Sequence, residues 1–114
     1  MQLGEYQKAI QHLEDFNAGS AKQIEAKVAG LLGDAYAELK KNTEALDQYK
    51  KAGTLFPEDQ AISSEYLFRA ALLAEINGKN EDAIELYQTI KDKYPRTDKG
   101  FVVDKYLARL GVVK

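Results

Sequence analysis

Apolar residues recur along this chain at spacings of three and four, which is the periodicity of an amphipathic helix and not of a strand. The clearest example is residues 26–57, where small and apolar side chains line one face of two successive segments. A polar break around Asn42 separates the segments, and Pro57 ends the second. This stretch therefore predicts two helices folded against each other as an antiparallel hairpin.

The same pattern occurs in partial copies on both sides of this stretch. Each copy has a polar turn, a helix start, and an alanine followed by Ile or Leu. The three alanines are Ala9, Ala45 and Ala83, so the copies recur at nearly equal intervals, the second slightly longer than the first. Self-similarity at such a period indicates an array of helical hairpins.

Turn and cap residues set the expected helix ends. We expect Ser20 and Asn42 to cap helices, Asn80 to open the fifth helix, Thr97 or Asp98 to open the last one, and Gly78 to follow a helix end. The fold expected is all-α with no strand. Its helices are predicted at residues 5–17, 21–40, 42–56, 60–77, 80–94 and 97–110.

The periodic positions also carry a family resemblance. Counted from Ala26, one 34-residue unit resembles a tetratricopeptide repeat at eight signature positions: Ala29, Leu32, Gly33, Tyr36, Ala45, Tyr49, Ala52 and Pro57. Counted from Ser64, a second unit resembles the same repeat at Leu67, Ala70, Ala71, Ala74, Ala83, Tyr87, Ile90 and Pro95. The resemblance implies a right-handed superhelical array of antiparallel helix hairpins, in which Gly33 allows close approach of a neighbouring helix.

The resemblance also divides the single domain. Residues 1–25 would be the second helix of a truncated repeat plus a linker, and 26–57 a full repeat. Residues 58–95 would be a repeat with an extended first helix, and 96–114 a C-terminal capping helix. Because a lone helix of the length of 5–17 is marginal in water, we expect it to pack on the next hairpin.

The truncated first unit suggests that Met1 begins a piece of a longer repeat protein. The intervals between Ala9, Ala45 and Ala83 exceed the usual repeat length, and together with the segment ending at Pro95 they resemble repeats of bacterial envelope proteins. This favours an extracytoplasmic, periplasmic domain of a membrane-anchored protein over a cytoplasmic one, and it leaves the compartment open.

In the family, the leading helices line a concave groove that binds segments of other proteins. Carried over by position, the groove would present Lys27, Leu31, Asp34 and Glu38 from one helix. The next leading helix would present Glu65, Phe68, Arg69, Leu72 and Glu75. Phe68 and Leu72 lie off the core stripe, so they are either apolar anchors for a partner or contacts with the final helix or with a neighbouring copy of the chain.

Composition removes several classes of function. The 16 basic and 18 acidic residues give a net charge of −2 and are interspersed, so no basic stripe favours a nucleic-acid partner. No apolar run is long enough to insert into a membrane. The chain has no cysteine, which excludes disulfides, and its only histidine, His12, is expected at the surface.

No catalytic constellation, metal-ligand set or cofactor motif occurs in the sequence. The preferred hypothesis is a non-enzymatic scaffold that binds a protein or peptide segment in the concave groove. The alternative is a structural or oligomerisation module that associates with copies of itself through the groove or the unpaired first helix.

Overall fold

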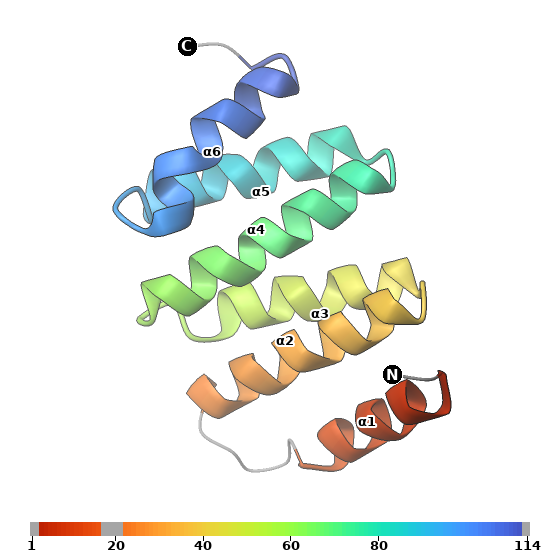
Figure 1. Cartoon of the computed structure of the whole chain (residues 1–114). Coiled ribbons are helices and arrows are strands. Elements are labelled where there is room, and N and C mark those ends of the chain that lie inside the picture. The colour runs from red at the N-terminus through yellow and green to blue at the C-terminus, as the bar shows by residue number, and fades with distance from the viewer. Residues whose placement is uncertain (1–2, 17–21, 113–114) are drawn as a thin grey trace.

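The computed structural model describes residues 3–16 and 22–112, which form a row of helices that reverse direction at each turn (Figure 1). The described residues contain no strand, so the all-α prediction is confirmed, and each predicted helix end lies within two residues of the observed one. The helices are α1 (Leu3–Phe16), α2 (Lys22–Glu38), α3 (Asn42–Leu55), α4 (Gln60–Ile76), α5 (Asn80–Lys93) and α6 (Asp98–Arg109).

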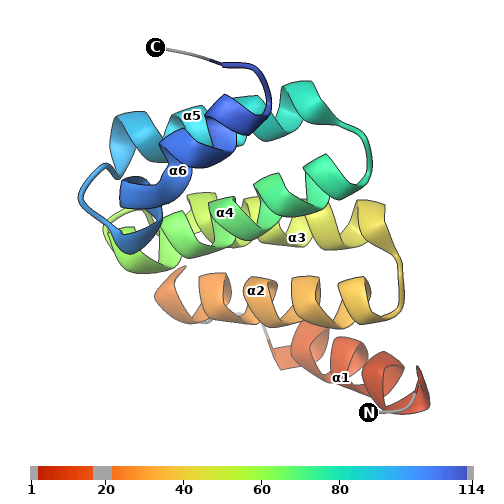
Figure 2. The same ribbon diagram turned by 45° about the horizontal axis from the view of Figure 1, so that its top comes forward.

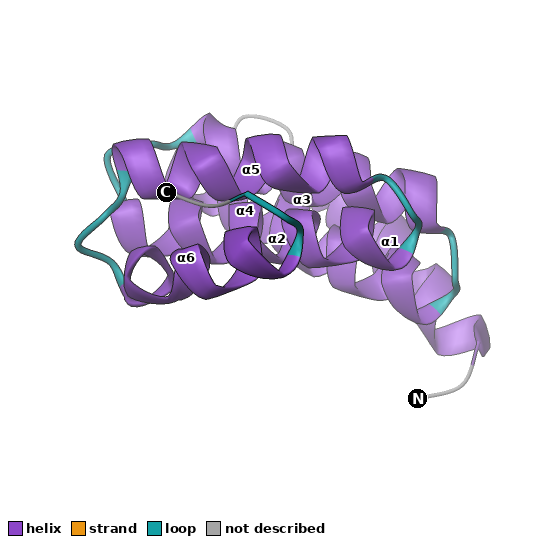
Figure 3. Cartoon of the chain, turned by 90° about the horizontal axis from the view of Figure 1, so that it is seen from above, coloured by secondary structure: helices purple, strands orange, loops and turns teal. Residues whose placement is uncertain are grey.

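Two hairpins, α2–α3 and α4–α5, stack in sequence, with α1 at one end and α6 at the other (Figures 1 and 2). Seen from above, α3 and α5 lie in one layer, and α2, α4 and α6 in another (Figure 3). Helix α6 contacts both α5 and α4, while α2 contacts α4 directly. The leading helices of successive hairpins therefore share one face of the molecule.

Small side chains lie where the helices of a hairpin meet. Ala45 and Ala83 are fully buried, as the periodicity predicts. Gly33 allows the expected close approach, because a Cβ added there would lie 2.5 Å from the ring of Tyr49. The main buried cluster consists of Leu46, Tyr49, Leu67, Phe68, Ala70, Ala71, Ala74, Ala83, Tyr87, Ile90, Tyr94, Val103 and Leu107.

Helix α1 packs on α2, as expected for a short helix without a hairpin partner of its own. Ile10 of α1 is buried with Val28, Leu32 and Ala35 of α2, and Tyr6 packs against the edge of this group. This second apolar cluster supplies the tertiary contact that a helix of this length needs for stability.

Among the helices whose starts are described, α3 to α6, two are capped by side chains. Asp59 accepts a hydrogen bond from the Ile62 amide at the start of α4, and Thr97 accepts one from the Gly100 amide at the start of α6. After α4, Gly78 has φ +78°, the left-handed conformation that favours glycine.

The predicted cap at Asn42 is wrong, whereas α5 begins at Asn80 as predicted. Both are the first residues of their helices, the cap positions are Lys41 and Lys79, and neither lysine makes a side-chain capping bond. The Asn42 side-chain amide instead donates to the Asn77 side-chain oxygen, 3.0 Å away at the α4–α5 corner. The Ser20 cap and the His12 side chain lie outside what the structure describes.

Candidate partner-binding cleft

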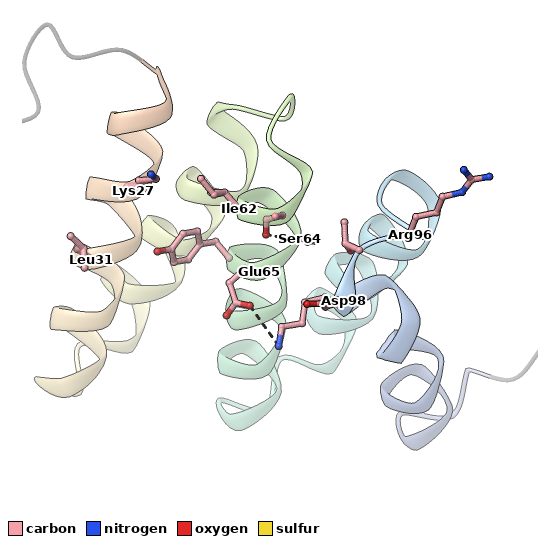
Figure 4. Close-up of a pocket in the computed structure, with 11 residues that line it drawn as sticks. Lys27, Leu31, Ile62, Ser64, Glu65, Arg96 and Asp98 are labelled. Atoms are coloured by element: carbon pink, nitrogen blue, oxygen red, sulfur yellow. Dashed lines mark hydrogen bonds and ion pairs between the residues drawn. The ribbon is translucent and has the colours of Figure 1, made fainter.

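A cleft of about 740 Å³ lies between α2, α4 and the corner that joins α5 to α6 (Figure 4). It opens on the face shared by the leading helices. Its lining residues are Lys27, Leu31, Ala61, Ile62, Ser64, Glu65, Tyr66, Arg96, Thr97, Asp98 and Lys99.

The apolar part of the cleft comes from α2 and α4. Leu31 is 50% exposed, while Ile62 and Tyr66 are half-buried. The ring of Tyr66 lies so close to Gly30 that a Cβ at that position would clash with it. Glycine at this point of α2 therefore lets the Tyr66 ring lie directly on the helix backbone and form part of the cleft wall.

The charged part of the cleft is centred on Glu65. Its carboxylate accepts from the Arg69 Nε at 2.8 Å and lies 3.6 Å from the Lys99 Nζ (Figure 4). The Lys99 ammonium also lies 4.6 Å from the centre of the Phe68 ring. Among the described side chains, those of residues 4–11 and 22–112, no ion pair joins Lys27 or Arg96 to a carboxylate.

Beside the cleft lies a first polar cluster, formed by Asp34, Tyr49, Tyr66 and Arg69. The Arg69 Nη1 lies 3.1 Å from both carboxylate oxygens of Asp34, and Oδ1 of Asp34 also accepts a hydrogen bond from the Tyr49 hydroxyl. The Tyr66 ring stacks on Tyr49 and lies beneath the Arg69 guanidinium. Burial, reinforced by the bond to Asp34, raises the pKa of Tyr49.

A second polar cluster repeats this arrangement with Glu75, Tyr87, Tyr106 and Arg109. The Arg109 Nη2 lies 2.8 Å from both oxygens of Glu75, and the Tyr87 hydroxyl donates to Glu75 at 2.9 Å. The Tyr106 ring stacks on Tyr87 and lies beneath the Arg109 guanidinium. Burial, then the bond to Glu75, raises the pKa of Tyr87.

The first cluster connects the α2–α3 hairpin to α4, and the second connects the α4–α5 hairpin to α6. Asp34 and Arg69 are 44% and 38% exposed at their side chains, and exposed ion pairs contribute only about 0–1 kcal/mol each to stability. Their main consequence is geometric, since each arginine is held to an acid on the preceding leading helix. The first cluster therefore sets how α2 and α4 lie beside the cleft.

The structure brings only some of the predicted groove residues together. Lys27, Leu31 and Glu65 line the cleft. Asp34 and Arg69 belong to the first polar cluster, and Glu75 to the second. Glu38 accepts a hydrogen bond from Tyr6 of α1, and Leu72 packs half-buried against the main core.

Phe68 is not an exposed anchor, so that expectation is corrected. Its side chain is only 5% exposed, with edge-on ring contacts at 5.7 Å to Tyr87 and 4.9 Å to Tyr106, measured between centroids. Because Tyr106 lies on α6, the contact with the final helix, which was the other interpretation of this residue, is the one observed.

The sequence reasoning missed the contribution of the α5–α6 corner. Arg96, Thr97, Asp98 and Lys99 all line the cleft. In the sequence they signal only a helix start after Pro95, and the turn that brings them towards α4 depends on tertiary packing.

No group of three acidic or histidine side chains among residues 4–11 and 22–112 is arranged to hold a metal ion. No helix in the same part of the chain is long and apolar enough to cross a membrane.

The sequence was also compared with known proteins. A family model described as tetratricopeptide repeat matches residues 31–59 and 65–97, which together make up more than half of the 114 residues. Comparison with curated proteins and with solved structures found no significant match.

Proposed function

The chain belongs to the tetratricopeptide repeat family, and we propose that it is a scaffold whose cleft between α2, α4 and the α5–α6 corner binds a segment of a partner protein. Repeats of this family generally mediate protein–protein interaction. No catalytic step and no cofactor is part of the proposal.

The observation that supports this site is an exposed apolar surface inside a cleft that is also lined by charged side chains. Leu31 is 50% exposed within the cleft, and it lies with Ile62 and Tyr66 among charged side chains. A concave site with apolar walls and a few polar groups is the usual form of a binding site. Removing Leu31 from water on binding would supply affinity, and the surrounding charges would supply orientation.

Selection of binding peptides from a random display library tests the proposal. Peptides enriched on the wild-type chain should lose affinity for Leu31→Glu, which places a charge in the apolar part of the cleft. The matched control is Phe101→Glu, because Phe101 is 73% exposed and does not line the cleft. Equal binding to both variants, or no enriched peptide, would contradict the proposal.

Self-association is the competing function, and light scattering distinguishes the two. We expect a monomer at the concentrations used for peptide binding. A dimer that Leu31→Glu dissociates would show that the cleft binds a second copy of the chain and would replace the proposed function.

We also propose that the protein works outside the cytoplasm, attached to a bacterial envelope. The support is the lengthened repeat spacing, marked by Ala9, Ala45 and Ala83, which resembles that of envelope repeat proteins. Fractionation of cells that produce the full-length protein tests this, and recovery in the cytoplasm would contradict it.

A further inference from the structure

We infer that the cleft selects partner segments in which an apolar side chain is flanked by carboxylates. This inference deepens the proposed function and rests on it. It follows from the balance of paired and unpaired charges in the cleft and from their placement around its apolar part.

The unpaired charge of the cleft is mainly positive. Its lining contains three cations, Lys27, Arg96 and Lys99, and two carboxylates, Glu65 and Asp98. Glu65 is already engaged, because it binds Arg69 at 2.8 Å and lies 3.6 Å from Lys99. A negatively charged partner can therefore form new ion pairs without breaking those of Glu65.

Lys27 and Arg96 provide this unpaired positive charge. Neither forms an ion pair with a side chain of residues 4–11 or 22–112, the part of the chain whose side chains are described, and both are exposed. Of the two carboxylates that line the cleft, Asp98 also has no ion pair among the described side chains. The cleft lining therefore contains two unpaired cations and one unpaired carboxylate. The chain as a whole carries a net charge of −2, so the attraction for carboxylates is local to the cleft.

The placement of the two cations defines the order of groups in the partner. In Figure 4, Lys27 on α2 and Arg96 at the α5–α6 corner stand on opposite sides, with Ile62 and Ser64 of α4 between them. The apolar surface between the two cations is that of Ile62, because Leu31, half exposed and one turn after Lys27 on α2, lies farther from Arg96 than Lys27 does in Figure 4. A partner with an apolar side chain in the middle and a carboxylate on each side matches this order of charge and apolar surface.

The peptide library provides the test. Enriched peptides should contain Asp or Glu on both sides of Leu, Ile, Val or Phe. One enriched peptide, labelled with a fluorophore, is then titrated with the chain while its anisotropy is measured. Replacing its acidic residues by Asn or Gln should weaken binding roughly tenfold or more, and added salt should weaken it further.

Variants of the chain identify the cations responsible. Lys27→Glu and Arg96→Glu should each weaken binding of this peptide roughly tenfold, since each reverses a charge that meets a carboxylate. The matched control is Lys51→Glu on α3, because Lys51 is exposed, does not line the cleft and undergoes the same change of charge. This control should bind as the wild type does.

The possible failures are distinguishable. Peptides that require Leu31 but contain no acidic residues would overturn the inference and leave the proposed function standing. Unchanged affinity after the acidic residues of the peptide are replaced would do the same, and that measurement needs no variant of the chain. If no peptide is enriched, both fail.

Discussion

Replacing Phe68 by alanine tests whether this residue belongs to the core or to the partner site. The ring is 5% exposed and packs edge-on against Tyr87 and Tyr106. Burying a phenylalanine removes about 150–200 Å² from water, which at about 25 cal/mol per Å² is worth about 4–5 kcal/mol as an upper estimate. We expect Phe68→Ala to lower the free energy of unfolding by about 3–5 kcal/mol.

Urea unfolding followed by circular dichroism measures this loss, and amide hydrogen exchange locates it. Because the Phe68 ring contacts Tyr106, the amides of α6 should lose more protection than those of α2. The matched control is Leu31→Ala, since Leu31 is 50% exposed and its truncation should cost no more than about 0.5 kcal/mol.

The contrary result is equally clear. If Phe68→Ala cost less than about 1 kcal/mol while abolishing peptide binding, Phe68 would be a partner anchor and the burial argument would be refuted. Comparable stability losses for Phe68→Ala and Leu31→Ala would refute it as well.

Three further changes test the packing and the polar clusters. Ala83→Leu should lower the melting temperature through overpacking worth about 1–3 kcal/mol, whereas Glu85→Leu on the exposed side of α5 should not. Gly33→Ala should also lower it, although alanine favours helix by about 1 kcal/mol, because the new Cβ would lie 2.5 Å from the Tyr49 ring; a rise would show that the ring can move. The raised pKa of Tyr49 means that its neutral form is favoured by folding, so stability should be lost as the pH rises above about 10, where unfolded tyrosine ionises. Tyr49→Phe should cost about 1 kcal/mol at neutral pH and reduce this alkaline loss in urea titrations; an identical alkaline loss would exclude a contribution from Tyr49.

The helices and the hairpin packing could be predicted because they depend on local periodicity. Residues three and four apart share a helix face whatever surrounds them, so Ala45 and Ala83 could be placed at buried crossings from spacing alone. Gly33 was predictable for a similar reason, since a glycine inside a helix needs a compensating contact.

The exposure of Phe68 could not be predicted in this way. Its position on α4 shows which direction it faces, but whether that direction is covered depends on Tyr106 of α6, which lies beyond the whole of α5 along the chain. The corner residues Arg96 and Lys99 raise the same difficulty. Their sequence indicates a helix start, and only the packing of α6 against α4 brings them to the cleft.

The two polar clusters show how α6 relates to the rest of the array. Tyr106 and Arg109 of α6 stand in the same order and at the same separation as Tyr66 and Arg69 of α4. In both pairs the tyrosine stacks on a tyrosine of the preceding hairpin, and the arginine binds an acid of the preceding leading helix.

Helix α6 therefore makes the contacts of a leading helix, whether or not it also covers the end of the array. Leading helices line the face on which the cleft opens, so the first turn of α6 extends the wall that α2 and α4 begin. Lys99, in this first turn of α6, lies 3.6 Å from Glu65 of α4. This ion pair connects the α6 wall of the cleft to the α4 wall. The cleft is thus lined by three successive leading helices, and the partner proposed for it would contact all three.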